Sequence, residues 1–131
     1  MKKSIKNVLM VTGLCLGIVS VSTAVHAASY DTTVPVFKDF ESSNVTKSGT
    51  SSGQNHAITF EGAGKLVAWI ENEGGSNITN KVTYSAPQSM PLHYSLGGDK
   101  WTGKKVHLNL STSADTYNSI ETSGNWYNYG Y

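Results

Sequence analysis

Apolar and polar residues alternate along most of the chain after its N-terminal segment, and this alternation limits the fold more than any other feature. It is clearest in residues 105–110, where Val106, Leu108 and Leu110 share one face of an extended chain and polar residues take the other. No 3.6-residue period appears there, and Ser, Thr, Asn and Gly fill the gaps between apolar positions. We therefore expect an all-β fold.

Eight short segments are expected to be strands: residues 33–37, 56–60, 66–70, 78–86, 92–96, 106–110, 117–122 and 125–131. Their spacing and the turn residues between them predict a single small antiparallel β-sandwich of seven or eight strands. Pro35 makes the first an edge strand, because proline cannot donate to a ladder. The continuously apolar segment 66–70 is expected at the centre of a sheet. Ser123 and Gly124 are expected to turn a final hairpin.

The expected core consists of the apolar residues on the inward faces of these strands. Burial of each large apolar side chain contributes about 1.5–3 kcal/mol to stability. The core residues predicted from the alternation are Ile58, Phe60, Leu66, Ala68, Ile70, Val82, Tyr84, Leu92, Tyr94, Val106, Leu108 and Leu110.

Residues 1–27 have the pattern of a secretory signal peptide. Lysines at the start precede an apolar run over residues 8–21, and Ala27 provides a small residue before a cleavage site. The run is too short and too interrupted for a membrane span. We expect a secreted, extracellular protein that is not an integral membrane protein after cleavage. The expected organisation is a signal peptide over 1–27, an N-terminal strand and polar loop over 28–55, and a sandwich body over 56–131 that forms one domain with 28–55.

Charge and cysteine content exclude several classes of function. The one cysteine, Cys15, lies in the signal segment, so residues 28–131 cannot form a disulfide or a cysteine-based metal site. That part of the chain has seven lysines, nine acidic residues and no arginine. Because phosphate contacts dominate affinity for nucleic acids, we expect no nucleic-acid partner.

The histidines and carboxylates show no metal-binding spacing. His93 and His107 fall on the polar faces of their strands and are expected at the solvated surface, whereas His56 is expected to be partly buried. Glu71 and Glu73 flank a glycine-containing loop, and whether they bind calcium is left open. We expect no metal ion and no cofactor.

Serines are abundant, but no nucleophile motif such as G-x-S-x-G organises them. We therefore predict no catalytic residues and expect that the protein is not an enzyme.

Aromatic residues are the one group with an unusual distribution. The chain ends in a segment that places three tyrosines on one face of a strand, and Trp101 follows a glycine-rich turn. Aromatic rings can stack on sugars or dock into a partner. The predicted binding residues are Trp101, Trp126, Tyr127, Tyr129 and Tyr131.

Four segments, 64–72, 82–85, 106–110 and 123–126, resemble a family of small secreted β-rich proteins of Bacillus-type Gram-positive bacteria that has no established activity. The cysteine-free, exported chain with an aromatic C-terminal end is also similar to lactococcin-type bacteriocins, although it lacks their early Gly- and Trp-rich stretch. The first resemblance implies no activity, and the second implies an antimicrobial one.

Together these observations favour a small secreted, non-enzymatic binding protein that acts at or near the bacterial cell envelope, with a cell-envelope component or a carbohydrate as its partner. A bacteriocin-like antimicrobial protein is the more specific form of this hypothesis. Two alternatives stay open: a structural or extracellular-matrix protein that self-associates, and a secreted hydrolase.

Overall fold

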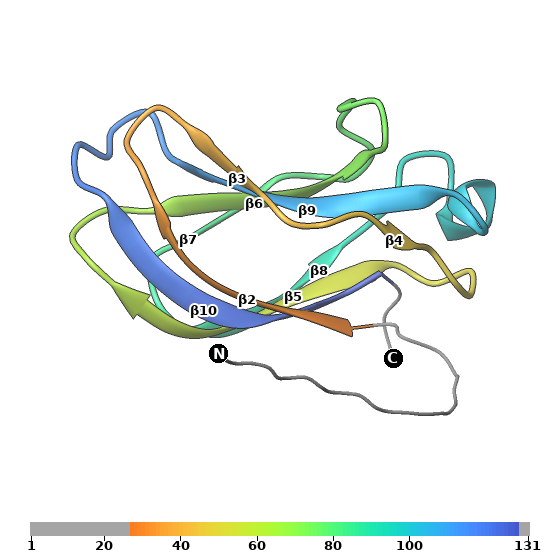
Figure 1. Ribbon diagram of the computed structural model, residues 1–131, viewed down its shortest axis with the longest axis horizontal. Coiled ribbons are helices and arrows are strands. Elements are labelled where there is room, and N and C mark those ends of the chain that lie inside the picture. Colours follow the sequence, from red (N-terminus) through yellow and green to blue (C-terminus); the bar gives the residue numbers. More distant parts are fainter. Residues whose placement is uncertain (1–26, 129–131) are drawn as a thin grey trace, which may run out of the picture.

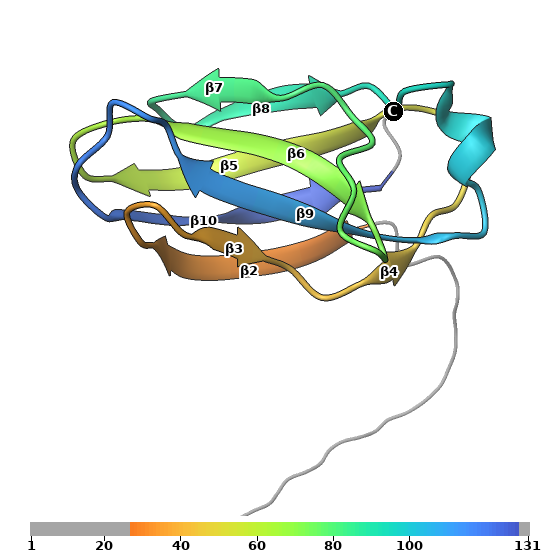
Figure 2. The ribbon, with the colours of Figure 1, turned by 90° about the horizontal axis from the view of Figure 1, so that it is seen from above.

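A computed structural model describes residues 27–128 as two antiparallel β-sheets packed face to face (Figures 1 and 2). This confirms the predicted all-β sandwich. The predicted signal segment lies outside the described residues, except that Ala27 begins the first described strand.

The first sheet has four strands in the order β2 (Ala27–Val34), β10 (Ile120–Tyr127), β5 (Gly53–Glu61) and β8 (Gln88–Leu92). Strand β2 is at the sheet edge, as expected, but it lies earlier than predicted and ends at Val34. Pro35 follows directly, and its missing N–H prevents the ladder from continuing.

The second sheet has the order β3 (Asp39–Glu41), β9 (Lys105–Thr112), β6 (Leu66–Asn72) and β7 (Val82–Tyr84). The two-residue strand β4 (Val45–Thr46) also pairs with β9, beyond the end of β3. Strand β6 lies between β9 and β7 and is buried on both faces, which confirms its predicted central position. A short 3-10 helix, η3 (Gly98–Trp101), lies between β8 and β9 in the chain.

The core lies between the two sheets and contains most of the predicted residues. Phe60 and Val82 are only partly buried and pack against its edge. Side chains that the alternation did not identify complete it: Tyr30, Val34, Ala57, Ile78, Met90, Ile120 and Trp126.

Ile58 was predicted in the core, but half of it is exposed. The cause is a β-bulge in strand β5. Ser123 pairs with Thr59 and the next residue, Gly124, pairs with Ala57, so Ile58 has no partner across the ladder. An extra residue reverses the alternation at that point. Ala57 and Phe60 therefore both face inward, while Ile58 faces solvent.

The predicted final hairpin is wrong, because Ser123 and Gly124 lie in the middle of the single strand β10. Glycine is required at position 124 by close packing rather than by a turn. A Cβ atom there would lie 2.3 Å from the backbone oxygen of His56 and 2.7 Å from the hydroxyl of Tyr30. No other residue fits without displacing the strand β5 backbone.

The polar segment 42–55 is more ordered than the predicted loop, since it contains β4 and the start of β5. Asn55 is fully buried and accepts a hydrogen bond of 2.8 Å from the Tyr30 hydroxyl. Lys47 is also buried: its ammonium group donates to the backbone oxygens of Ser48 and Gly49 and lies 4.8 Å from the centre of the Tyr94 ring. Burial lowers the pKa of Lys47.

Within residues 27–128, no helix is both long enough and apolar enough to cross a membrane.

Candidate functional site

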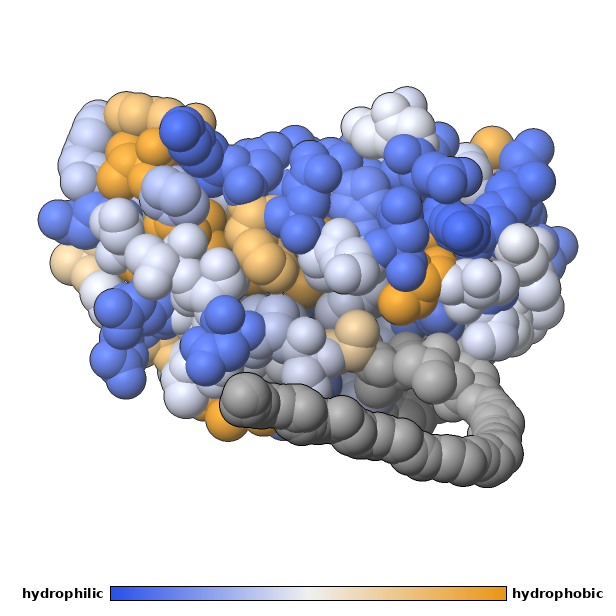
Figure 3. Space-filling model, viewed as in Figure 1, coloured by the Kyte–Doolittle hydropathy of each residue, from blue (hydrophilic) through white to orange (hydrophobic). Residues whose placement is uncertain are grey.

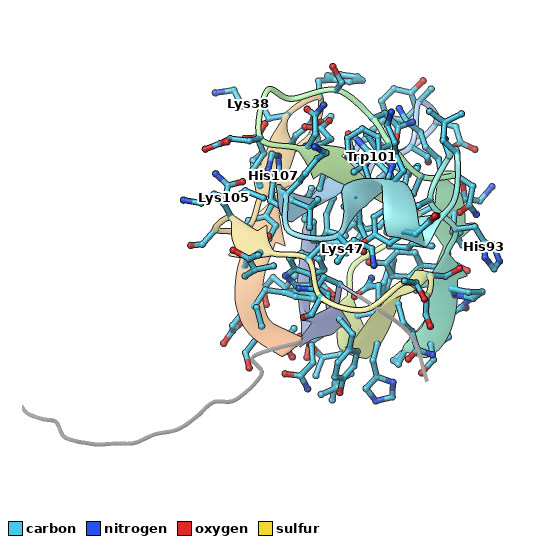
Figure 4. The ribbon with its side chains drawn as sticks, turned by 90° about the vertical axis from the view of Figure 1, so that its right-hand side faces the viewer. Lys38, Lys47, His93, Trp101, Lys105 and His107 are labelled. Atoms are coloured by element: carbon cyan, nitrogen blue, oxygen red, sulfur yellow. The ribbon has the colours of Figure 1, made fainter. Side chains whose placement is uncertain are left out.

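The helix η3 (Gly98–Trp101) forms one end of the sandwich and holds Trp101 at the surface (Figures 2 and 4). Gly98 allows η3 to pack closely on the loop before β5, because a Cβ atom at this position would lie 2.1 Å from the backbone oxygen of Thr50. The Trp101 indole packs against the core edge, and its Nε1–H donates to the backbone oxygen of Ser95 at 3.1 Å. These contacts fix the orientation of the ring.

Trp101 lines a hollow of about 470 Å³ between the β6–β7 loop and the start of β9. The β6–β7 loop contributes Asn72, Glu73 and Gly74, and the segment after η3 contributes Gly103, Lys104 and Lys105. Glu73, Lys104 and Lys105 are exposed, whereas Trp101 is half-buried. An aromatic ring thus lies beside amide, carboxylate and ammonium groups in one concave surface.

Of the other predicted binding residues, Trp126 is misassigned. Its side chain is only 1 % exposed and belongs to the core, because alternation along β10 points it toward the opposite sheet. Tyr127 is half-buried on the other face of β10. Tyr129 and Tyr131 lie outside the described residues, so their predicted role stays a prediction.

Two exposed aromatic residues at the opposite end of the sandwich were not predicted. Phe37 and Tyr117 are each more than 70 % exposed, and their rings meet edge to face at 6.4 Å. Figure 3 shows apolar side chains gathered at this end, over the turns that join β2 to β3 and β9 to β10. The alternation could not reveal the pair, because both residues lie in turns.

The three described histidines differ from prediction in two cases. His93 is exposed, as expected, and accepts or donates a hydrogen bond at Nδ1 with the Ser52 hydroxyl at 2.8 Å. His56 was expected to be partly buried but is exposed, because it shares the bulged strand with Ile58. His107 was expected at the solvated surface, yet it is only 6 % exposed. Figure 4 shows His107 and His93 on opposite sides of the sandwich.

Glu71 and Glu73 do not form the carboxylate pair that a shared calcium site would need. Glu71 is buried at the end of β6 and its Oε1 lies 3.2 Å from Nε2 of His107, whereas Glu73 is exposed in the hollow. The fold instead brings Glu41, Glu71 and His107 together, with one possible ligand atom of each within 4.8 Å of the others. The spacing of these residues in the sequence gave no sign of the cluster.

Two serine–histidine contacts bear on the hydrolase alternative. One joins Ser52 to His93, and the other joins Ser89 to His56 across the β5–β8 ladder. All but the half-buried Ser52 are exposed. Within residues 27–128, neither histidine has the carboxylate partner that orients the base in a catalytic triad.

No protein-family model matches the chain, and no curated protein or solved structure is significantly similar to it.

Proposed function

We propose that this protein is an exported, non-enzymatic binding protein of the bacterial cell envelope that binds a wall glycan in the hollow around Trp101. The observation that carries the proposal is the position of Trp101, a predicted binding residue whose ring lines a concave surface together with polar side chains. Ligand sites are concave and combine aromatic surface with a few polar groups.

The chemistry of the hollow suits a saccharide. The Trp101 face can stack on the C–H face of a sugar ring. The Asn72 carboxamide can donate and accept hydrogen bonds with hydroxyl groups, and the Glu73 carboxylate can accept them. Lys104 and Lys105 give the rim more positive than negative charge, which favours a glycan that carries carboxylate or phosphate groups.

A sedimentation assay with insoluble Gram-positive cell walls tests the proposal. The walls are used with their teichoic acids retained and after acid extraction of these polymers. We expect the protein to sediment with both preparations if it binds the peptidoglycan glycan, and only with the first if it binds teichoic acid. Failure to sediment with either preparation would reject the proposal.

Two variants locate the binding surface. Lys104→Glu combined with Lys105→Glu changes only exposed side chains of the hollow, and Trp101→Leu removes the ring while keeping an apolar group against the core. Each is expected to weaken binding roughly tenfold, which corresponds to about 1.4 kcal/mol. The charge-matched control is Lys38→Glu with Lys65→Glu, in turns at the other end of the sandwich. Equal binding by all variants would exclude the hollow.

The antimicrobial form of the proposal has a direct test. The protein is spotted on lawns of related Gram-positive bacteria, and a zone of inhibition that the Trp101→Leu variant does not produce would support it. Sedimentation velocity over a range of concentrations tests the alternative of a self-associating matrix protein, which would show a mass that rises with concentration.

A further inference from the structure

We propose that Glu41, Glu71 and His107 form a binding site for one divalent transition-metal ion, with Zn²⁺ the best-matched ion. The three residues come from β3, β6 and β9, which are adjacent in the second sheet, and they lie on its outer face. This site is separate from the Trp101 hollow and does not depend on the proposed function.

The possible ligand atoms already have suitable spacing. Tetrahedral zinc with ligands at about 2.0–2.1 Å places neighbouring ligand atoms about 3.3 Å apart. Glu71 Oε1 lies 3.2 Å from His107 Nε2, and Glu41 Oε1 lies 4.0 Å from the same nitrogen. The Glu41 side chain is 60 % exposed, so it can rotate to close the remaining gap.

In Glu71 and His107, the side-chain atom that does not face the cluster is held by a hydrogen bond. Trp69 Nε1–H donates to Glu71 Oε2 at 2.8 Å, which leaves Oε1 directed at His107. His107 Nδ1 lies 2.9 Å from Oδ1 of Asn44. Asn44 lies between β3 and β4, and both of these strands pair with β9. The chain between them has one residue more than the stretch of β9 opposite it, and this extra residue brings Asn44 to His107. Metal-binding histidines are commonly oriented by such a partner on the second ring nitrogen.

The contact between His107 and Asn44 bears on which ring nitrogen is free to bind a metal ion. A carboxamide oxygen only accepts hydrogen bonds, so with the Asn44 oxygen facing it Nδ1 of His107 is the protonated nitrogen, and a neutral ring in this tautomer presents a lone pair on Nε2. That lone pair faces the carboxylates of Glu41 and Glu71. A metal ion bound between the three groups would neutralise this negative charge, which is costly to bury at His107 and Glu71.

Asn109 gives a second, independent observation in favour of a bound ion. Its side chain is fully buried, and neither its Oδ1 nor its Nδ2 has a hydrogen-bond partner. Leu108 and Leu110 face the core, so Asn109 points to the outer face, between its cross-strand neighbours Glu41 and Trp69. A buried carboxamide without partners costs free energy unless a ligand satisfies it. We assign its oxygen to the fourth position around the metal. One imidazole with oxygen ligands suits zinc better than calcium, which takes six to eight oxygen atoms.

Metal titration tests the assignment. It uses the untagged protein, both as its host produces it and after treatment with a chelator. Isothermal titration calorimetry and native mass spectrometry are run with ZnCl₂, and CaCl₂ is titrated in parallel. We expect one bound Zn²⁺ per chain with micromolar or tighter affinity, and at least about tenfold weaker binding by Glu41→Gln and His107→Gln. The matched controls, Glu73→Gln and His93→Gln, change exposed residues outside the cluster and are expected to bind as the parent does.

Glu41→Gln decides the result if His107→Gln fails to fold, because Glu41 is exposed and its substitution leaves the core intact. Absence of stoichiometric Zn²⁺ binding would overturn the proposal. Zinc binding that Glu41→Gln leaves unchanged would also overturn it, as would a preference for Ca²⁺ over Zn²⁺.

Discussion

The hydroxyl of Tyr94 donates a hydrogen bond of 2.6 Å to the backbone oxygen of Asn128. This bond ties the segment after β8 to the end of β10. Asn128 is itself buried, and its carboxamide donates to the backbone oxygen of Thr46 in β4. The two residues therefore join both sheets at the end of the sandwich where the described chain stops.

Alkaline pH is expected to destabilise the protein through its buried tyrosines. Burial raises the pKa values of Tyr30, Tyr84 and Tyr94 above the usual 10.0. The unfolded chain then loses these protons at a lower pH than the folded chain does. Stability should be complete below about pH 10 and fall at higher pH, by up to about 1.4 kcal/mol per pH unit for each group. Denaturant unfolding measured between pH 9 and 12 checks this.

Tyr94→Phe provides the control for the alkaline effect. This variant should show a smaller decrease of stability per pH unit above pH 10. Any loss of stability from the missing hydrogen bond is the same at every pH, so the slope is unaffected by it. Because the pKa of Lys47 is lowered in the folded protein, the contribution of Lys47 to stability increases as pH rises toward 10.5. This opposite effect is present in both proteins. Identical slopes for the variant and the parent would contradict the role of Tyr94.

Gly124→Ala should destabilise the fold by about 1–3 kcal/mol, the usual cost of overpacking. The added methyl group would collide with the backbone of β5 rather than with a flexible side chain. Gly74→Ala is the control, because its methyl group would meet nothing closer than 3.5 Å. Thermal unfolding of both variants measures the difference. An unchanged melting temperature for Gly124→Ala would place this residue in a turn.

Two isoleucines test the bulge in β5. Ile70→Ala, fully buried, should cost about 2–5 kcal/mol, whereas Ile58→Ala, half exposed, should cost less than about 1 kcal/mol. Urea unfolding of the two variants compares them directly. Equal losses would show that Ile58 faces the core and that the strand has no bulge.

Asn109→Val should increase stability by about 1–2 kcal/mol in the presence of a chelator, because it removes a buried carboxamide that has no partner. The same variant should bind Zn²⁺ more weakly. Asn55→Val is the matched control: Asn55 is equally buried but bonded to Tyr30, so its loss should be destabilising. A destabilised Asn109→Val would mean that its carboxamide is satisfied in the metal-free protein.

The fold class could be predicted from sequence because the alternation of apolar and polar residues indicates which side chains face inward. A sandwich requires two sheets, each with one apolar face of this kind. Errors arose where a partner strand overrides the local pattern. Ile58 follows the alternation perfectly, yet its register depends on β10, which is more than 60 residues away. Ser123 and Gly124 have the composition of a turn, but Gly124 is needed for close contact between strands.

The candidate sites were predictable only in part for the same reason. Trp101 was identified because an aromatic residue after a glycine-rich turn is conspicuous. The outer-face cluster joins Glu41, Glu71 and His107 across three strands, and no local spacing encodes such a contact. His107 alternates as a surface residue does, yet it is buried, and its ring contacts Asn44 and Glu71 on that face.

The most direct measurement of the proposed binding site is an NMR titration with a soluble peptidoglycan fragment and, in parallel, with a soluble teichoic-acid fragment, observed at the three tryptophan indole N–H signals. Trp101 lines the hollow, Trp69 lies on the outer face and Trp126 lies in the core. We predict a saturable shift of the Trp101 signal, with the Trp69 and Trp126 signals unchanged. A Trp101 signal that does not move while the fragment binds elsewhere, or no binding of wall fragments at all, would contradict the account.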